Sequence, residues 1–133
     1  NFNVQYATLS NSSFEGAHIT GHGFNYSSLT DVNLVSVRAP VSYYDLTCVR
    51  CDFTYARTAG SNFNQASFTD SVFAHALLMA GQWNQVEGSG NDFTSAHLGG
   101  VAVLGIALTN STFSNTICPD FSVSDAAPGG TCW

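Results

Sequence analysis

Residues 61–80 read SNFNQASFTDSVFAHALLMA, and in this stretch large apolar residues recur every five positions. They are Phe63, Phe68, Phe73 and Leu78. An α-helix places apolar residues three or four apart, and a half-buried strand places them two apart. A period of five therefore indicates a repeated unit made of a short strand and a corner.

Each unit has two inward positions, a large residue at its centre and a small residue two positions earlier, as strand alternation requires. The pattern covers most of the chain, with weak core positions at Ala39, Thr58 and Gly88. The centres are Val4, Leu9, Phe14, Ile19, Phe24, Leu29, Leu34, Ala39, Tyr43, Cys48, Phe53, Thr58, Phe63, Phe68, Phe73, Leu78, Trp83, Gly88, Phe93, Leu98, Val103, Leu108, Phe113 and Cys118. His22 falls at an inward small-residue position, and we interpret it as a core histidine.

The period slips by one residue around the stretch APVSYY, residues 39–44. Pro40 has no backbone N–H and cannot make an ordinary ladder bond, so we expect a bulge or bend near residues 39–48. One interpretation is a kink that shapes a binding face. The other, which we favour, is a tolerated deletion of one residue.

Units such as ASFTD, SNFNQ, NDFTS, AHLGG and STFSN resemble the pentapeptide-repeat family, and the resemblance covers residues 2–118. It implies an all-β fold, a right-handed quadrilateral β-helix with four units in each of about six coils. Residues 1–118 would form this β-helix and residues 119–133 a separate tail. Side chains 20 positions apart would then stack as one internal ladder. Its members are Phe14, Leu34, Phe53, Phe73, Phe93 and Phe113.

The tail CPDFSVSDAAPGGTCW, residues 118–133, lacks the five-residue pattern and resembles the Cys-Pro-Asp end of exported members of the family. It departs from that end in lacking the Gly that often follows the Asp. The resemblance implies a disulfide between Cys118 and Cys132 that closes the tail. A disulfide across a loop of this size stabilises by roughly 3 kcal/mol.

Cys48 and Cys51 form a CxxC sequence that is open to several interpretations. It is compatible with a redox pair, with a small disulfide and with half of a zinc site. Both residues fall at inward positions, where they would also serve as small core residues. No second CxxC or paired His accompanies them, so we expect no metal and no cofactor.

The composition limits the partners and the location of the protein. The net charge is −6, with three Arg and no Lys, so direct binding of nucleic acid is not expected. No apolar run is long enough to span a membrane. Four cysteines without an evident metal site favour an oxidising compartment, which means secreted, periplasmic or lumenal. Because the chain begins at Asn1 without a signal peptide, we expect a processed form.

Three outward columns are candidate surfaces. His18, Arg38, Arg57 and His97 form a short positive stripe, open to binding an anion or to being a solvated face. Charges of opposite sign in a second column are expected to pair across neighbouring strands. These are Asp31, Arg50 and Asp70. A third column carries hydroxyls and raises the hypothesis of ice binding, although the family often has Ser or Thr there. It contains Ser10, Thr30, Thr69, Ser89 and Thr109.

No nucleophile, base and orienting group come together in the motifs, so we expect no catalytic residues and no enzymatic activity. The favoured function is an exported structural protein whose coil ends stack on another copy, a mode of association that can build filaments, because open strand edges invite pairing. The alternative is a protein-binding module. It includes the DNA-mimic type in the same family, which protects bacterial gyrase, although few acidic residues are present.

Overall fold

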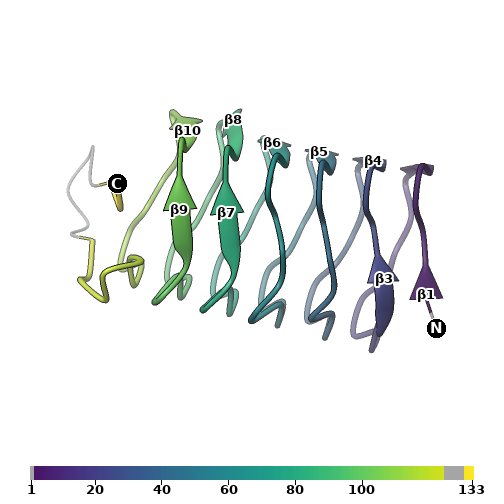
Figure 1. Ribbon diagram of the computed structural model, residues 1–133, viewed down its shortest axis with the longest axis horizontal. Coiled ribbons are helices and arrows are strands. Elements are labelled where there is room, and N and C mark those ends of the chain that lie inside the picture. The colour runs from purple at the N-terminus through teal and green to yellow at the C-terminus, as the bar shows by residue number, and fades with distance from the viewer. Residues whose placement is uncertain (1, 125–130) are drawn as a thin grey trace.

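The computed structural model describes residues 2–124 and 131–133, and its regular elements are short strands. Every strand has two or three residues, and corners separate consecutive strands (Figure 1). The strands are β1 (Phe2–Asn3), β2 (Thr8–Ser10), β3 (Gly21–Gly23), β4 (Ser28–Thr30), β5 (Thr47–Val49), β6 (Ser67–Thr69), β7 (Gln82–Asn84), β8 (Glu87–Ser89), β9 (Ala102–Leu104) and β10 (Ala107–Thr109).

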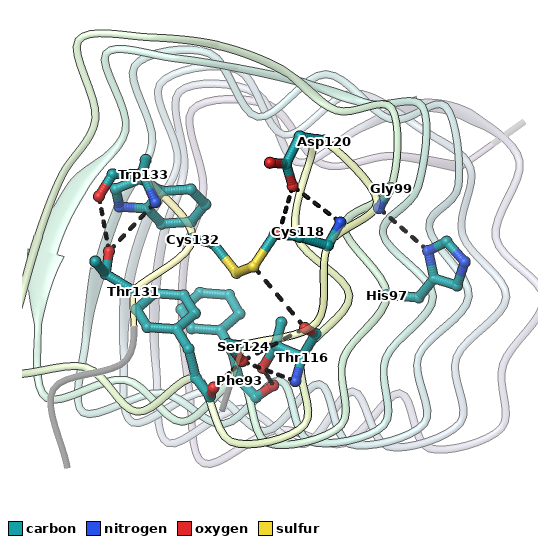
Figure 2. The surroundings of a disulfide bond; sticks show 12 residues. Phe93, His97, Gly99, Thr116, Cys118, Asp120, Ser124, Thr131, Cys132 and Trp133 are labelled. Carbon is teal, nitrogen blue, oxygen red and sulfur yellow. Dashed lines mark hydrogen bonds between the residues drawn. A yellow bond between two sulfur atoms is a disulfide. The ribbon is translucent and has the colours of Figure 1, made fainter. Parts of the chain in front are cut away.

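The strands stack in parallel along one axis and form a β-solenoid. One face is a six-stranded sheet in the order β10-β8-β6-β5-β4-β2, and the pairs β1-β3 and β7-β9 lie on another face. The chain therefore crosses the first face six times and makes about five turns between the first crossing and the last. The coil is four-sided when viewed along its axis (Figure 2). The predicted fold class is confirmed.

The five-residue period has its physical origin at the corners. One residue in almost every unit has a positive φ, for example Asn11, Gly16, Tyr26, Asp31 and Ser36, with non-glycine values between 48° and 65°. A left-handed residue turns the chain sharply, and only isolated residues adopt this conformation readily. Each short strand therefore ends in a corner, and the inward pattern restarts in the next unit.

Aromatic side chains fill the interior as a continuous stack. The rings of Phe53, Phe73, Phe93 and Phe113 are almost parallel, with centroids 4.8 to 5.0 Å apart. Leu34 lies fully buried in the same column of side chains, and Phe14 packs half-buried against the core. The structure thus brings together all six residues of the internal ladder.

One coil is a residue shorter than its neighbours. Asn33 pairs with Ser13 at a separation of 20 residues but with Asp52 at a separation of 19. The lost residue lies between Arg38 and Ser42, because Ser42 again pairs with a partner 20 residues away. Val41 N–H donates to the carbonyl of Ala39, and Tyr43 Oη donates to the same oxygen. Parallel pairing continues on both sides of this tight turn.

Two expectations about inward positions are wrong or incomplete. His22 is exposed and not part of the core, because positive φ angles at Gly21 and Gly23 and an irregular pairing with β1 turn its side chain outward. Gly88 is a required glycine: its φ is 139°, and a Cβ there would overlap the carbonyl oxygen of Phe68. A simple two-residue alternation does not reveal such close backbone approaches.

After the last coil the chain turns back on itself. Val123 pairs with Ile117 in an antiparallel bridge, and the N–H of Cys118 donates to the carbonyl of Ser122. The tail predicted for residues 119–133 includes residues 125–130, which lie outside the described residues. The described parts of the tail therefore lie against the C-terminal end of the solenoid.

Candidate functional site

Among the described residues, the returning chain lies against only part of the C-terminal end of the solenoid. The side around Phe113 and Cys118 carries the returning chain, and the ring of Trp133 packs edge-on against Phe113 at 5.1 Å. Figure 2 shows Trp133 and the disulfide across the end of the coil. β9 and β10 lie at the ends of their sheets, with no further strand beside them among the described residues.

On the outer side of these two strands, no residue of the described part of the chain forms a ladder with them. In a parallel ladder alternate residues bond to opposite neighbours. The N–H of Ala102 donates to the carbonyl of Gly81, and the N–H of Ala107 donates to the carbonyl of Val86, so both residues bond to the preceding coil. The next residue in each strand, Val103 or Leu108, therefore directs its N–H and C=O groups away from the solenoid. An edge of this kind is a template for pairing with another strand.

Apolar side chains surround the open edge. Val103, Leu104, Ile106 and Trp133, together called the C-terminal apolar end below, line a shallow hollow of about 400 Å³. Leu104 is 73% exposed, whereas Val103 occupies an inward position and is still 37% exposed. Burying such side chains stabilises by about 1.5–3 kcal/mol each, so this surface favours a covered state.

Sequence reasoning did not single out this site, although a signal exists. The unit around Val103 reads VAVLG, with the apolar Ala102 and Leu104 on both sides of the centre, where most units carry polar residues. An apolar residue at an outward position of one terminal coil indicates a surface that another segment or chain covers.

The disulfide implied by the tail is present between Cys118 and Cys132, with Cα atoms 5.0 Å apart. Beside it, the carboxylate of Asp120 accepts hydrogen bonds from the hydroxyl and the N–H of Ser122. The pKa of Asp120 is lowered because both bonds favour the charged carboxylate. The disulfide and this turn fix the chain across the end of the coil, as Figure 2 shows.

Cys48 and Cys51 are free thiols, so the disulfide considered for this pair is not formed. Both side chains are buried, and Cys51 Sγ is directed at the carbonyl oxygen of Leu29, 3.8 Å away. Burial raises the pKa of the Cys48 thiol, and a hydrogen bond with Cys51 contributes in the same direction. Cysteines buried in apolar surroundings are unreactive, so this pair serves as core packing.

The positive stripe forms a column but not a uniform site. Parallel bridges join His18 to Arg38, Arg38 to Arg57, Arg57 to Leu77 and Leu77 to His97. His97 is half-buried, and its Nδ1 accepts the N–H of Gly99, so this histidine is bonded locally. The interpretation of the stripe as a solvated face, rather than an anion site, stays a prediction.

The second column contains one ion pair. Arg50 donates from Nε and Nη2 to the two carboxylate oxygens of Asp31, at 2.7 and 2.8 Å. The hydrogen bond with Arg50 lowers the pKa of Asp31, and the same bond raises that of Arg50. Both side chains are largely exposed, and exposed pairs contribute little to stability. Among the described residues Asp70 makes no ion pair.

Within residues 2–124 and 131–133, no three His, Cys, Asp or Glu side chains cluster in a way that suits a metal ion. The same part of the chain contains no helix with the length and apolarity needed to cross a membrane.

Comparison with known families agrees with this architecture. The family model for pentapeptide repeats matches residues 48–79, with eight copies of the repeat. The same unit and the same corner conformation continue on both sides of the match. Residues 48–79 therefore consist of pentapeptide repeats. No curated protein matches the chain by sequence.

Several solved structures are similar to the chain. One is a pentapeptide-repeat protein from the thylakoid lumen of Arabidopsis thaliana, with 19% identity over 83% of this chain and 67% of that one, and a TM-score of 0.44. Another is Rfr23 from the cyanobacterium Cyanothece 51142, with 13% identity, coverage of 79% and 88%, and a TM-score of 0.43. A third is QnrB1, a plasmid-mediated fluoroquinolone resistance protein, with 11% identity, coverage of 84% and 70%, and a TM-score of 0.37.

Proposed function

We propose that this protein is a non-enzymatic, exported β-solenoid rod that associates end to end with other copies of itself. The observation that carries the proposal is the C-terminal apolar end. There, Val103 and Leu104 are exposed beside the edges of β9 and β10, which have no neighbouring strand among residues 2–124 and 131–133. Pairing a further coil against these edges would continue the hydrogen-bond ladder and remove the apolar side chains from water.

A second copy offers a surface of matching form. At the opposite end of the described solenoid, β1 and β2 lie at the edges of their sheets. Phe2, Val4 and Leu9 are only partly buried there, as Ile106 and Leu108 are at the C-terminal end. Two ends with the same cross-section and strand direction allow head-to-tail contacts, which generate filaments where the rotation between copies does not close a ring.

Location outside the reducing cytoplasm is part of the proposal. The Cys118–Cys132 disulfide supports it, because disulfides persist in oxidising compartments. We further propose that residues 119–133 act as a closing tail that covers one side of the last coil. The open side, around Leu104, then directs where the next copy binds.

A DNA-mimic role receives less support from the surface. In two columns the acidic side chains are not adjacent: on one face the neutral Val72 lies between Asp52 and Asp92, and on another the positively charged Arg50 lies between Asp31 and Asp70. Such spacing does not produce the dense negative charge of a duplex. Binding to a different protein is compatible with the fold, and the experiment below distinguishes it from self-association.

The proposal is tested by replacing Leu104 with Lys and measuring the molar mass of the oxidised chain by light scattering over a range of concentrations. We expect the wild type to increase in mass with concentration and Leu104→Lys to stay monomeric, since a charge is costly to bury in a contact. The matched control is Leu77→Lys, an exposed leucine on a lateral face that should leave association unchanged. A wild type that is monomeric throughout would contradict self-association and leave another protein as the partner.

A further inference from the structure

The outward side of the six-stranded sheet is a second, chemically distinct surface. Each of its strands directs two side chains to solvent, and these form two columns parallel to the axis. The first column is Thr8, Ser28, Thr47, Ser67, Glu87 and Ala107. The second is Ser10, Thr30, Val49, Thr69, Ser89 and Thr109. Nine of these side chains are hydroxyls, and the surface is called the hydroxyl face below.

The hydroxyl face is regular in two directions. All six strands pair residue against residue, with no irregularity in register along the sheet. The strands lie in a row along one edge of the solenoid (Figure 1). Neighbouring strands are about 4.8 Å apart, and the two outward residues of a strand are about 6.7 Å apart. The hydroxyls therefore occupy a nearly rectangular, repeating lattice.

The hydroxyls on this face are available to an external partner. Among the described residues, only Thr109 donates an intramolecular hydrogen bond, to the carbonyl of Gly88 at 3.4 Å. Amide side chains on the face of β7 differ, because Asn64 donates to Gln82 and also accepts from the N–H of Asn84. Each hydroxyl of the face can donate and accept, so the face as a whole bonds to water.

The chemistry of the hydroxyl face limits what it binds. Glu87 is its one ionisable side chain, so an ionic polymer finds no complementary charge. No aromatic side chain belongs to either column, so the face offers no ring on which an aromatic or apolar ligand could stack. The complementary partner is uncharged, rigid, rich in hydrogen-bond donors and acceptors, and periodic in two dimensions.

We propose that the hydroxyl face binds the surface of ice. Water oxygens in a prism plane of hexagonal ice repeat along two perpendicular directions at distances comparable to the two spacings of the face. Hydroxyls fixed on a rigid sheet hold first-layer water at lattice positions before contact, which reduces the entropy lost on binding. The proposal does not depend on the end-to-end association above, because the two surfaces are separate.

The test is partition into ice, measured on the oxidised chain. A solution is frozen slowly on a cooled surface, and the protein is quantified in the ice and in the remaining liquid; thermal hysteresis is recorded on the same samples. We expect the wild type to enter the ice and to lower the freezing point below the melting point. Exclusion of the wild type from ice, with no hysteresis, overturns the proposal.

Matched variants assign the activity to this face. Thr47→Lys places a long charged side chain at the centre of the hydroxyl face and should abolish partition. Thr112→Lys makes the same change at an exposed outward position on the neighbouring face and should have no effect. Circular dichroism melting checks that both variants fold. Equal loss in both, or retention in Thr47→Lys, overturns the proposal.

A variant that should gain activity is a stronger test, because misfolding can cause a loss of ice binding but not an increase. Val49 lies between Thr30 and Thr69 in the second column and has nearly the shape of threonine without the hydroxyl. Val49→Thr completes the column, so we expect greater partition and hysteresis than in the wild type. Activity that is unchanged or reduced by a well-folded Val49→Thr variant contradicts a role for the hydroxyl lattice.

Discussion

The ring of Phe73 lies face to face with the ring of Phe93, with centroids 4.8 Å apart and planes 2° from parallel. The two residues are 20 positions apart in sequence and occupy the same position in consecutive coils. In a solenoid each coil contacts only its neighbours, so stability is a sum of such contacts along the axis. A defect in the stack therefore reduces the stability of the coils on both sides.

Replacing Phe73 with Ala should be strongly destabilising. The side chain is fully buried and contacts aromatic rings above, below and beside it. Removing a buried Phe costs about 3–5 kcal/mol of unfolding free energy. Denaturant unfolding measures the change, with Leu77→Ala, at an exposed outward position, as the control that should cost no more than about 0.5 kcal/mol. Equal effects of the two changes would contradict the assigned inward and outward positions.

Two buried threonines should respond in opposite directions to replacement by valine. Thr58 Oγ1 is buried without a hydrogen-bond partner among the described residues, so Thr58→Val should stabilise the chain by about 1 kcal/mol. Thr116 Oγ1 donates to the carbonyl of Phe93 at 2.7 Å, so Thr116→Val should destabilise it by about 1 kcal/mol. Thermal melting of both variants checks the prediction, and a stability loss in Thr58→Val would mean that its hydroxyl has a partner such as a bound water.

The four cysteines should separate into two classes by chemical labelling. A thiol reagent should find no reactive thiol in the native chain and two after unfolding, because Cys48 and Cys51 are buried and reduced. Reduction of the unfolded chain should release two more, from Cys118 and Cys132. If protein isolated from its source shows four free thiols by mass spectrometry, the proposed oxidising compartment loses its main support.

The carboxyl of Asp120 should titrate below its ordinary value of 3.8, because it accepts two hydrogen bonds from Ser122. A lowered native pKa means that the contribution to stability is present above the ordinary value and is lost as the pH falls through the native value. Carbon-detected NMR titration measures the pKa, and Ser122→Ala should raise it. Asp31, whose pKa is lowered by its hydrogen bond with Arg50, serves as the internal reference, and its pKa should not change in this variant.

The repeat determines much of the fold because its period of five is visible in the residues themselves. The ladder is visible as phenylalanines 20 positions apart, at Phe53, Phe73, Phe93 and Phe113. The slip after Ala39 is visible because the next unit centre, Tyr43, follows after four residues instead of five. His22 and Gly88 show the limit of the pattern, because their geometry depends on φ angles and on the backbone of the adjacent coil. The pattern of inward positions gives no information on φ angles or on close approaches between the backbones of adjacent coils.

The candidate site was less predictable for a different reason. Val103 occupies an inward position, but its burial depends on what packs against the end of the last coil. The five-residue period of the sequence contains no information on that packing. Cys48 and Cys51 illustrate the same limit, since a CxxC sequence is compatible with a disulfide and the structure places both thiols in the core unbonded to each other. Leu104, an apolar residue at an outward position, is the one signal that the sequence carried.

End-to-end association is tested most directly by negative-stain electron microscopy of the oxidised chain at increasing concentrations. The account predicts rods one solenoid wide whose length grows with concentration and shortens to single units in Leu104→Lys. Single particles of constant size in the wild type at every concentration would contradict it, and would mean that the edges of β9 and β10 do not bind a second copy.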